Sequence, residues 1–159
     1  WNGIRHKGRD NARTPMQWTD DENAGFTDGT PWLAMNPNYR QINVREQEAR
    51  TDSVLAYYRR LVHLRKADAY RETFTYGIFE PAYQEMADVF AYYRVSGESG
   101  QRILVAANFG TDAVSLTLAY PCRQVLLSNL RAESAVETAC EKANALTLGS
   151  CEVAVIELG

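Results

Sequence analysis

The stretch VFAYYRVSGESGQRILVAANF, residues 89–109, decides the fold class of the second half of this chain. Apolar side chains alternate with their neighbours along both arms, which is typical of strands that place one face in a core. The alternating positions are Val89, Ala91, Tyr93 and Val95 in the first arm and Ile103, Val105, Ala107 and Phe109 in the second. Residues 96–100, between the arms, are turn formers. The stretch therefore predicts a β-hairpin.

Further β-prone runs surround this hairpin after about residue 70. They occupy residues 113–118, 123–127, 145–148 and 152–158, and Phe74, Tyr76 and Ile78 alternate ahead of it. Short runs at regular spacing, about seven or eight in all, are typical of an antiparallel sandwich or barrel. We therefore predict a chain that is mostly β, with residues 71–159 forming an antiparallel β-domain.

One amphipathic helix is predicted over residues 54–66. Its apolar side chains, which recur at helical spacing, are Val54, Tyr57, Tyr58, Leu61 and Leu64. Either Asp52 or Ser53 supplies a good N-cap, and the basic residues near the C-terminal end suit the helix dipole. A shorter helical turn is expected over residues 44–49.

The first fifty residues are predicted to form one long, irregular loop. They are rich in Gly, Pro, Asn, Asp and Thr and keep neither the strand period nor the helix period. Their large aromatic residues are Trp1, Trp18, Phe26, Trp32 and Tyr39, which a disordered segment would normally lack. Long loops of this kind usually belong to binding sites or lids. We expect a larger fold to cover this loop, and the isolated chain to self-associate or to order it poorly.

The composition narrows the class of partner. The 159 residues are 45% hydrophobic, which is enough for a core of ordinary size. The net charge is −3, the isoelectric point is about 5.4, and Lys and Arg gather into no basic face, so nucleic acid is not an expected partner. No apolar run approaches the ~18 residues of a membrane span, and no signal pattern opens the sequence. We therefore expect a cytoplasmic location without a membrane partner.

The three cysteines, Cys122, Cys140 and Cys151, show no recognisable chemistry. They lie far apart and have none of the spacings of metal sites. We interpret them as three separate small side chains in a reducing cytoplasm. Neither a metal nor a cofactor is predicted.

The segment RDNARTPMQW, residues 9–18, is the candidate binding motif. Pro15 fixes its own φ and biases Thr14 toward extended geometry, so Arg13 is expected at the entrance of a conformationally restricted turn. Its guanidinium offers five donors in a planar fork, which suits a carboxylate or neighbouring sugar hydroxyls. Chemistry alone leaves open a second interpretation, in which Arg9 and Asp10 form a surface ion pair without a binding role.

The order of motifs resembles a known family. RDNARTPMQW is followed by DDENAGFTDGTPW and NPNYRQINV, and together they resemble the oligo-1,6-glucosidase branch of the α-amylase superfamily, with its dextran glucosidases and trehalose-6-phosphate hydrolases. The likeness continues through DSVLAYYRRLVHLRK and, more loosely, ILVAANF, so it covers nearly the whole chain.

The resemblance implies a three-part enzyme with a (β/α)8 barrel, a small inserted domain and a C-terminal antiparallel β-sandwich domain. Residues 1–70 would then be the end of the barrel, with a substrate-binding loop and the last barrel helix. Residues 71–159 would be the β-domain. Loops after the strands of such barrels build the active site.

The resemblance also implies roles for particular residues. In this family the arginine before Thr-Pro pairs with an aspartate from the first part of the barrel and holds hydroxyls of the terminal glucose, and that role falls on Arg13. Arg9 and Asp10 are further candidates that shape the loop. The retaining mechanism needs two carboxyl groups about 5 Å apart, which the family places on earlier barrel strands, so we predict no catalytic residue here.

The expected function is therefore that of the C-terminal part of an exo-acting retaining α-glucosidase acting on short oligosaccharides, with the isolated fragment inactive. Two alternatives stay within the superfamily: trehalose-6-phosphate hydrolase, and sucrose isomerase or trehalose synthase. A third is a non-catalytic β-domain with a structural or carbohydrate-binding role. An exposed aromatic platform on the β-domain would favour sugar binding.

Overall fold

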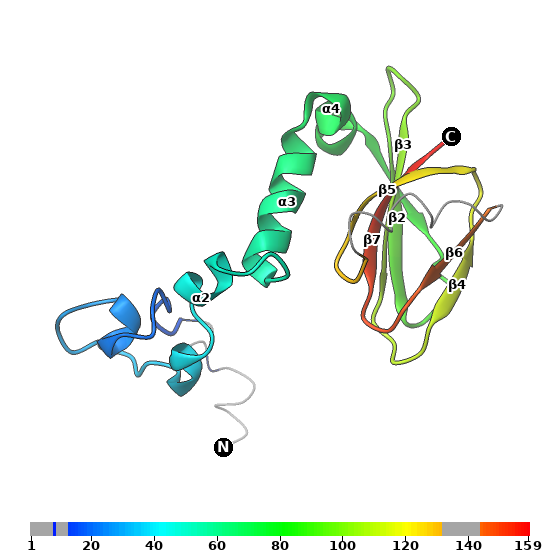
Figure 1. Cartoon of the computed structure of the whole chain (residues 1–159). Coiled ribbons are helices and arrows are strands. Elements are labelled where there is room, and N and C mark those ends of the chain that lie inside the picture. Colours follow the sequence, from blue (N-terminus) through cyan, green and yellow to red (C-terminus); the bar gives the residue numbers. More distant parts are fainter. Residues whose placement is uncertain (1–7, 9–12, 132–143) are drawn as a thin grey trace. The chain divides into compact units, whose positions relative to one another are not determined.

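The computed structural model describes residue 8, residues 13–131 and residues 144–159 (Figure 1). The chain divides into two compact units, Trp1–Arg59 and Arg60–Gly159.

The first unit is built from short turns. It contains the 3-10 helices η2 (Glu22–Gly25) and η3 (Pro37–Arg40), the short helix α2 (Val44–Glu48) and the beginning of α3 (Val54–Lys66). The described part of this unit has no strand, as expected for an irregular loop, and α2 confirms the predicted helical turn.

Helix α3 covers the predicted residues, and Ser53 caps its N-terminal end. The Ser53 hydroxyl oxygen accepts a hydrogen bond from the Ala56 N–H at 3.1 Å and donates one to the Gln47 carbonyl oxygen at 2.7 Å. No residue of α3 is buried, and Val54 and Tyr58 are 77% and 62% exposed. Tyr57, Leu61 and Leu64 are half-buried, so the predicted apolar side of this helix is only partly covered. No helix formed by the described residues is long and apolar enough to cross a membrane.

Replacing Ser53 by alanine is expected to destabilise the first turn of α3 by about 1 kcal/mol, because the Ala56 N–H loses its acceptor. The measurement is the amide exchange rate of Ala56 together with the thermal melt at 222 nm. Thr51→Ala, at an exposed neighbouring position, is the matched control. Equal exchange rates in the two variants would show that the cap contributes nothing.

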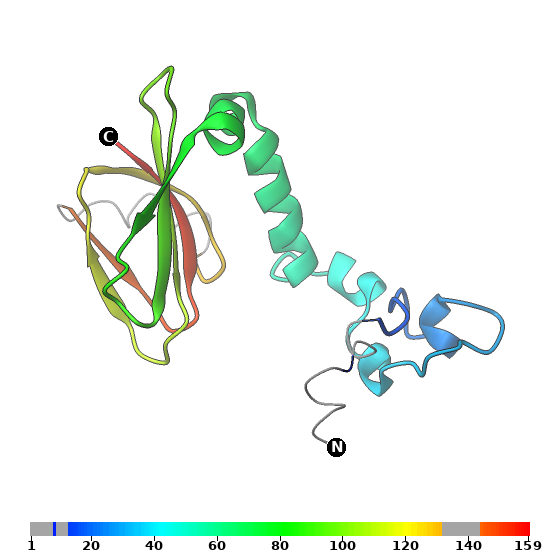
Figure 2. The same cartoon turned by 180° about the vertical axis from the view of Figure 1, so that it is seen from behind.

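The second unit contains the rest of α3, helix α4 and seven described strands (Figures 1 and 2). The elements are α4 (Asp68–Tyr76), β1 (Ile78–Ala82), β2 (Val89–Val95), β3 (Arg102–Asn108), β4 (Val114–Thr117), β5 (Cys122–Ser128), β6 (Ala145–Leu148) and β7 (Val153–Leu158). One sheet has the order β1-β2-β3-β7-β5, and the second pairs β4 with β6. All neighbouring strands are antiparallel, which confirms the predicted strand arrangement at this level.

The predicted hairpin is present as β2 and β3. The Ser96 N–H donates to the Gln101 carbonyl oxygen at 2.9 Å, and Gly100 adopts a φ of 71° in the turn, which glycine reaches without steric cost.

Both sheets contribute side chains to one buried core. Leu104, Ala106 and Ile156 come from the large sheet and Leu116, Leu146 and Leu148 from the small one. The alternation of apolar residues along each strand places these side chains on the inner face.

The prediction of a strand through Phe74 and Tyr76 is wrong, because both residues belong to α4. Tyr70, Thr73 and Phe74 recur at helical spacing, Thr73 and Phe74 are buried, and the Tyr70 and Phe74 rings meet edge to face at 6.5 Å. An alternation of three residues is too short to fix the period, and packing of the longer pattern decides it.

The prediction of three separate thiols is wrong for Cys122, which is disulfide-bonded. Distance along the sequence does not limit pairing, because a sheet brings remote segments together. Cys151 is free and exposed, and Cys140 lies outside the described residues. The cytoplasmic location therefore stays a prediction that the cysteines no longer support.

Candidate functional site

The segment around Arg13 combines a buried proline with an exposed arginine. Pro15 is buried, whereas Arg13 and Thr14 are exposed and lie outside any helix or strand. A proline ring fixes its own φ, and the buried Pro15 ring anchors the chain two residues after Arg13. The Arg13 guanidinium is therefore presented to solvent from an anchored position.

Backbone hydrogen bonds tie the residues after Pro15 to two other parts of the loop. The N–H groups of Trp18 and Thr19 donate to the Ala24 carbonyl oxygen at 2.9 and 3.0 Å. The Val44 N–H donates to the Gln17 carbonyl oxygen and the Arg45 N–H donates to the Trp18 carbonyl oxygen, both at 3.0 Å. A loop held at so many backbone groups keeps its shape without a sheet.

The Gln17 side chain forms two further hydrogen bonds within the loop. Its amide nitrogen donates to the Asn38 side-chain oxygen at 3.0 Å and to the Ile42 carbonyl oxygen at 2.5 Å. The segment after Arg13 is thus joined to η3 and to the residues before α2.

A left-handed turn at Asn23, Ala24 and Gly25 places the Ala24 carbonyl for these bonds. The three residues have φ values of 51°, 55° and 63°, and Ala24 is fully buried. The Asn23 side chain holds the turn by donating to the carbonyl oxygens of Thr27 and Gly29 at 3.2 and 3.0 Å. Strained backbone of this kind persists only where its surroundings fix it.

The acidic run after Trp18 is held by one arginine. Arg45 donates to Asp20 at 2.8 Å and to Asp21 at 2.7 Å, and all three side chains are more than half exposed. The hydrogen bond from Arg45 lowers the pKa of Asp21. Both ion pairs lie at the exposed surface of the loop, where such pairs contribute little stability.

The structure does not test the roles predicted for Arg13, Arg9 and Asp10. Arg13 is described and exposed, and it makes no ion pair with another described residue. Arg9 and Asp10 lie outside the described residues. Among the described residues, no three His, Cys, Asp or Glu side chains gather in a way that would hold a metal ion.

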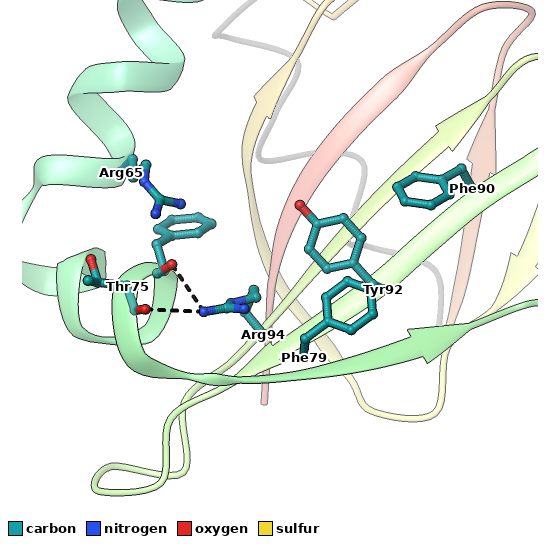
Figure 3. A pocket seen from close by; sticks show the side chains of 7 residues that line it. Arg65, Thr75, Phe79, Phe90, Tyr92 and Arg94 are labelled. Atoms are coloured by element: carbon teal, nitrogen blue, oxygen red, sulfur yellow. Dashed lines mark hydrogen bonds between the residues drawn. The ribbon is translucent and has the colours of Figure 1, made fainter.

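Sequence reasoning missed a hollow in the second unit, shown in Figure 3. It has a volume of about 400 Å³ and is lined by Arg65, Phe74, Thr75, Phe79, Phe90, Tyr92 and Arg94. The sequence did hold a signal, since Phe90, Tyr92 and Arg94 occupy alternate positions of β2 and so share one face.

Comparison with known proteins identifies the family. Residues 2–77 match the family described as alpha amylase, catalytic domain. The chain is 42% identical over 134 residues to the glucan 1,6-alpha-glucosidase of Streptococcus pneumoniae. The aligned region covers 84% of this chain and 24% of that protein. The chain is 39% identical over 138 residues to the oligo-1,6-glucosidase of Parageobacillus thermoglucosidasius, with the same two coverages.

Two further relatives differ in their named activities. The trehalose-6-phosphate hydrolase of Bacillus subtilis is 40% identical over 111 residues, or 69% of the chain and 19% of that protein. The crystal structure of isomaltulose synthase from Klebsiella sp. LX3 superimposes with a TM-score of 0.82 and 35% identity, over 95% of this chain and 26% of that one. The chain thus spans about a quarter of the length of the relatives that it matches. It belongs to the α-amylase superfamily, in the branch of oligo-1,6-glucosidases, glucan 1,6-alpha-glucosidases and trehalose-6-phosphate hydrolases.

Proposed function

We propose that this chain is the C-terminal part of an exo-acting retaining α-glucosidase that removes α-linked glucose from short oligosaccharides. The observation that carries the proposal is the exposed Arg13 on its anchored loop, inside the segment that matches the α-amylase catalytic domain. The identity to a glucan 1,6-alpha-glucosidase over 84% of the chain supports the same substrate class.

The finer architecture is part of this proposal. Residues 1–70 are the end of a (β/α)8 barrel and residues 71–159 the C-terminal domain, in which the two sheets form the layers of a sandwich. The catalytic-domain match ends at residue 77, one residue before β1, so it supports a boundary in this region but includes the whole of α4 in the first part. The single core shared by both sheets supports the two layers.

In this proposal Arg13 binds the terminal glucose of the substrate. Its planar fork can donate to two neighbouring sugar hydroxyls and to an aspartate of the preceding barrel at the same time. A site closed around one glucose unit accepts only a chain end, which makes the enzyme exo-acting. The two carboxyl groups of the retaining reaction, about 5 Å apart, belong to the preceding part of the barrel.

The isolated chain is expected to be inactive on isomaltose and on p-nitrophenyl α-glucoside, because acid–base and electrostatic groups supply most of the rate acceleration. The measurement is glucose release by the purified chain against a buffer blank. An active-site inactivator of glucosidases serves as the control for contaminating enzyme. Turnover that survives the inactivator would contradict the proposal.

Assays of the intact enzyme with different sugars determine which substrate it uses. Glucose released from isomaltose, with retention at the anomeric carbon by NMR, is the expected result. Trehalose 6-phosphate hydrolysed in preference to isomaltose would favour the activity named for the Bacillus subtilis relative. Conversion of sucrose into an isomer would favour the activity named for the Klebsiella relative.

A further inference from the structure

Three consecutive residues of the first unit, Asn23, Ala24 and Gly25, have left-handed backbone. Two of them are not glycine, and this conformation costs free energy in a residue that carries a Cβ atom. Strained backbone of this kind clusters at functional sites, where surrounding contacts hold it in place. We call residues 23–25 the left-handed turn.

The left-handed turn directs one carbonyl group at the segment that follows Arg13 in the sequence. The Ala24 carbonyl oxygen accepts hydrogen bonds from the N–H groups of both Trp18 and Thr19, at 2.9 and 3.0 Å. The Ala24 residue itself is fully buried. Because one oxygen serves both N–H groups, a shift of that carbonyl disturbs both hydrogen bonds at once.

Helix α2 holds the same segment through its carbonyl groups. The N–H groups of Val44 and Arg45, in the first turn of α2, donate to the carbonyl oxygens of Gln17 and Trp18 at 3.0 Å. The first N–H groups of a helix have no acceptor inside the helix, so the loop supplies the acceptors here. Residues 17–19 are therefore fixed between the left-handed turn and α2.

The link from residues 17–19 back to Arg13 is short and has few free torsions. Pro15 is buried; it fixes its own φ and restricts Thr14. Only one residue lies between Pro15 and the fixed segment. A displacement of residues 17–19 is therefore transmitted to Arg13, because no flexible stretch absorbs it.

Gly25 is the position at which the left-handed turn has least room. Its φ is 63°, and a Cβ atom added there would lie 2.7 Å from the Thr19 Oγ1 atom and 3.3 Å from the Thr19 Cγ2 atom. Threonine is branched at Cβ and restricted in its rotamers, so rotation of the side chain gives no easy relief. A methyl group at position 25 therefore pushes Thr19 away from the Ala24 carbonyl oxygen.

We infer that the left-handed turn positions Arg13 for the terminal glucose of the substrate, with Ala24 and Gly25 as positioning residues. The turn acts through residues 17–19 and does not contact the sugar itself. The inference rests on the proposed function for the role of Arg13. The competing interpretation is a turn that contributes only local stability to the loop.

Replacing Gly25 by alanine in the intact enzyme tests the inference. The value of kcat/KM is expected to fall at least about tenfold, because a small misplacement of a binding group has an effect of that size. Gly29→Ala is the matched control. Gly29 lies in the same loop without a left-handed φ, and an added Cβ atom would meet only the Thr27 Oγ1 atom, at 3.8 Å, so kcat/KM should stay within about twofold. Near-normal kcat/KM in Gly25→Ala would overturn the inference.

A compensating substitution tests the contact between Gly25 and Thr19. Thr19→Ala removes the two nearest atoms and leaves the Thr19 Cβ atom, 3.5 Å from the added methyl group, as an ordinary contact. In the Thr19→Ala enzyme, Gly25→Ala is therefore expected to lower kcat/KM less than about threefold, since the two sites are coupled. An undiminished fall would show that the effect does not pass through Thr19, which contradicts the inference.

A double-mutant cycle with Arg13 separates positioning from local stability. Gly25→Ala is expected to lower kcat/KM of the Arg13→Ala enzyme less than about twofold, because the side chain that the turn positions is then absent. A turn of purely local importance would lower kcat/KM by the same factor with and without Arg13, and that result would overturn the inference. Melting temperatures of all variants ensure that each assay is run on folded enzyme.

The choice of substrate keeps this inference apart from the proposed function. The cycle is run on whichever of isomaltose, trehalose 6-phosphate and sucrose the intact enzyme converts. A coupled cycle on one of the latter two, with isomaltose unchanged, would support the positioning role and reject the proposed function. Independent effects on isomaltose hydrolysis would keep the proposed function and reject the positioning role. Conversion of none of the three would reject both.

Discussion

Replacing Arg13 by alanine in the intact enzyme is expected to lower kcat/KM for isomaltose by about a hundred-fold or more while leaving the melting temperature nearly unchanged. Loss of a charge-assisted hydrogen bond to substrate costs roughly 1.5–3 kcal/mol, which is about ten- to a hundred-fold. Misplacement of the reacting carbon adds to that loss. Stability should persist because the Arg13 side chain is exposed and the loop is held by other residues, such as Pro15 and Gln17.

Two further variants make this experiment specific. Arg13→Lys is expected to recover little activity, since an ammonium group cannot reproduce the planar fork. Arg59→Ala removes an exposed ion pair with Glu48, and exposed pairs contribute at most about 1 kcal/mol of stability, so kcat/KM should change less than about threefold. Near-normal catalysis by Arg13→Ala would remove Arg13 from the binding site.

Replacing Glu152 by alanine is expected to destabilise the second unit by about 3–5 kcal/mol, because it leaves a largely buried arginine without its partner. The Glu152 carboxylate accepts from Arg131 Nε at 2.5 Å, from the Ser128 hydroxyl at 2.9 Å and from the Gly149 N–H at 2.8 Å. Arg131 also donates to the Thr147 carbonyl oxygen. This cluster joins the ends of β5, β6 and β7, so its loss should loosen both sheets.

Chemical denaturation of the isolated chain measures this effect. Glu98→Ala, an exposed carboxylate in the hairpin turn, is the matched control and is expected to stay within about 0.5 kcal/mol of the wild type. A Glu152→Ala variant as stable as the Glu98→Ala variant would show that the buried pair contributes no net stability.

The Glu152 carboxylate also makes the stability of the protein depend on pH. Burial by itself would raise the pKa of Glu152, but the bonds from Arg131, Gly149 and Ser128 outweigh it and lower the pKa below the ordinary value of 4.5. The stability that ionised Glu152 contributes is therefore fully present above about pH 4.5, its ordinary pKa. It is lost as the pH falls through the lower pKa of Glu152 in the folded protein. The stability difference between wild type and Glu152→Gln should accordingly shrink below about pH 4.

The sequence by itself determined the elements whose signals are local. Turn residues between two alternating runs predicted the β2–β3 hairpin, and helical spacing after Ser53 predicted α3 with its cap. Such features depend on backbone preference and on the period of apolar residues, which a short stretch of sequence contains in full.

Tertiary structure decided the features that need distant residues. Phe74 lies in a helix because its side chain is buried together with that of Thr73, at helical spacing. Cys122 forms a disulfide because folding brings residues together that are far apart in the sequence. The buried Glu152 and Arg131 pair and the aromatic side of β2 likewise appear only when the strands are placed beside one another. Burial, pairing and the choice of covered side are properties of neighbours in space, and a linear pattern does not contain them.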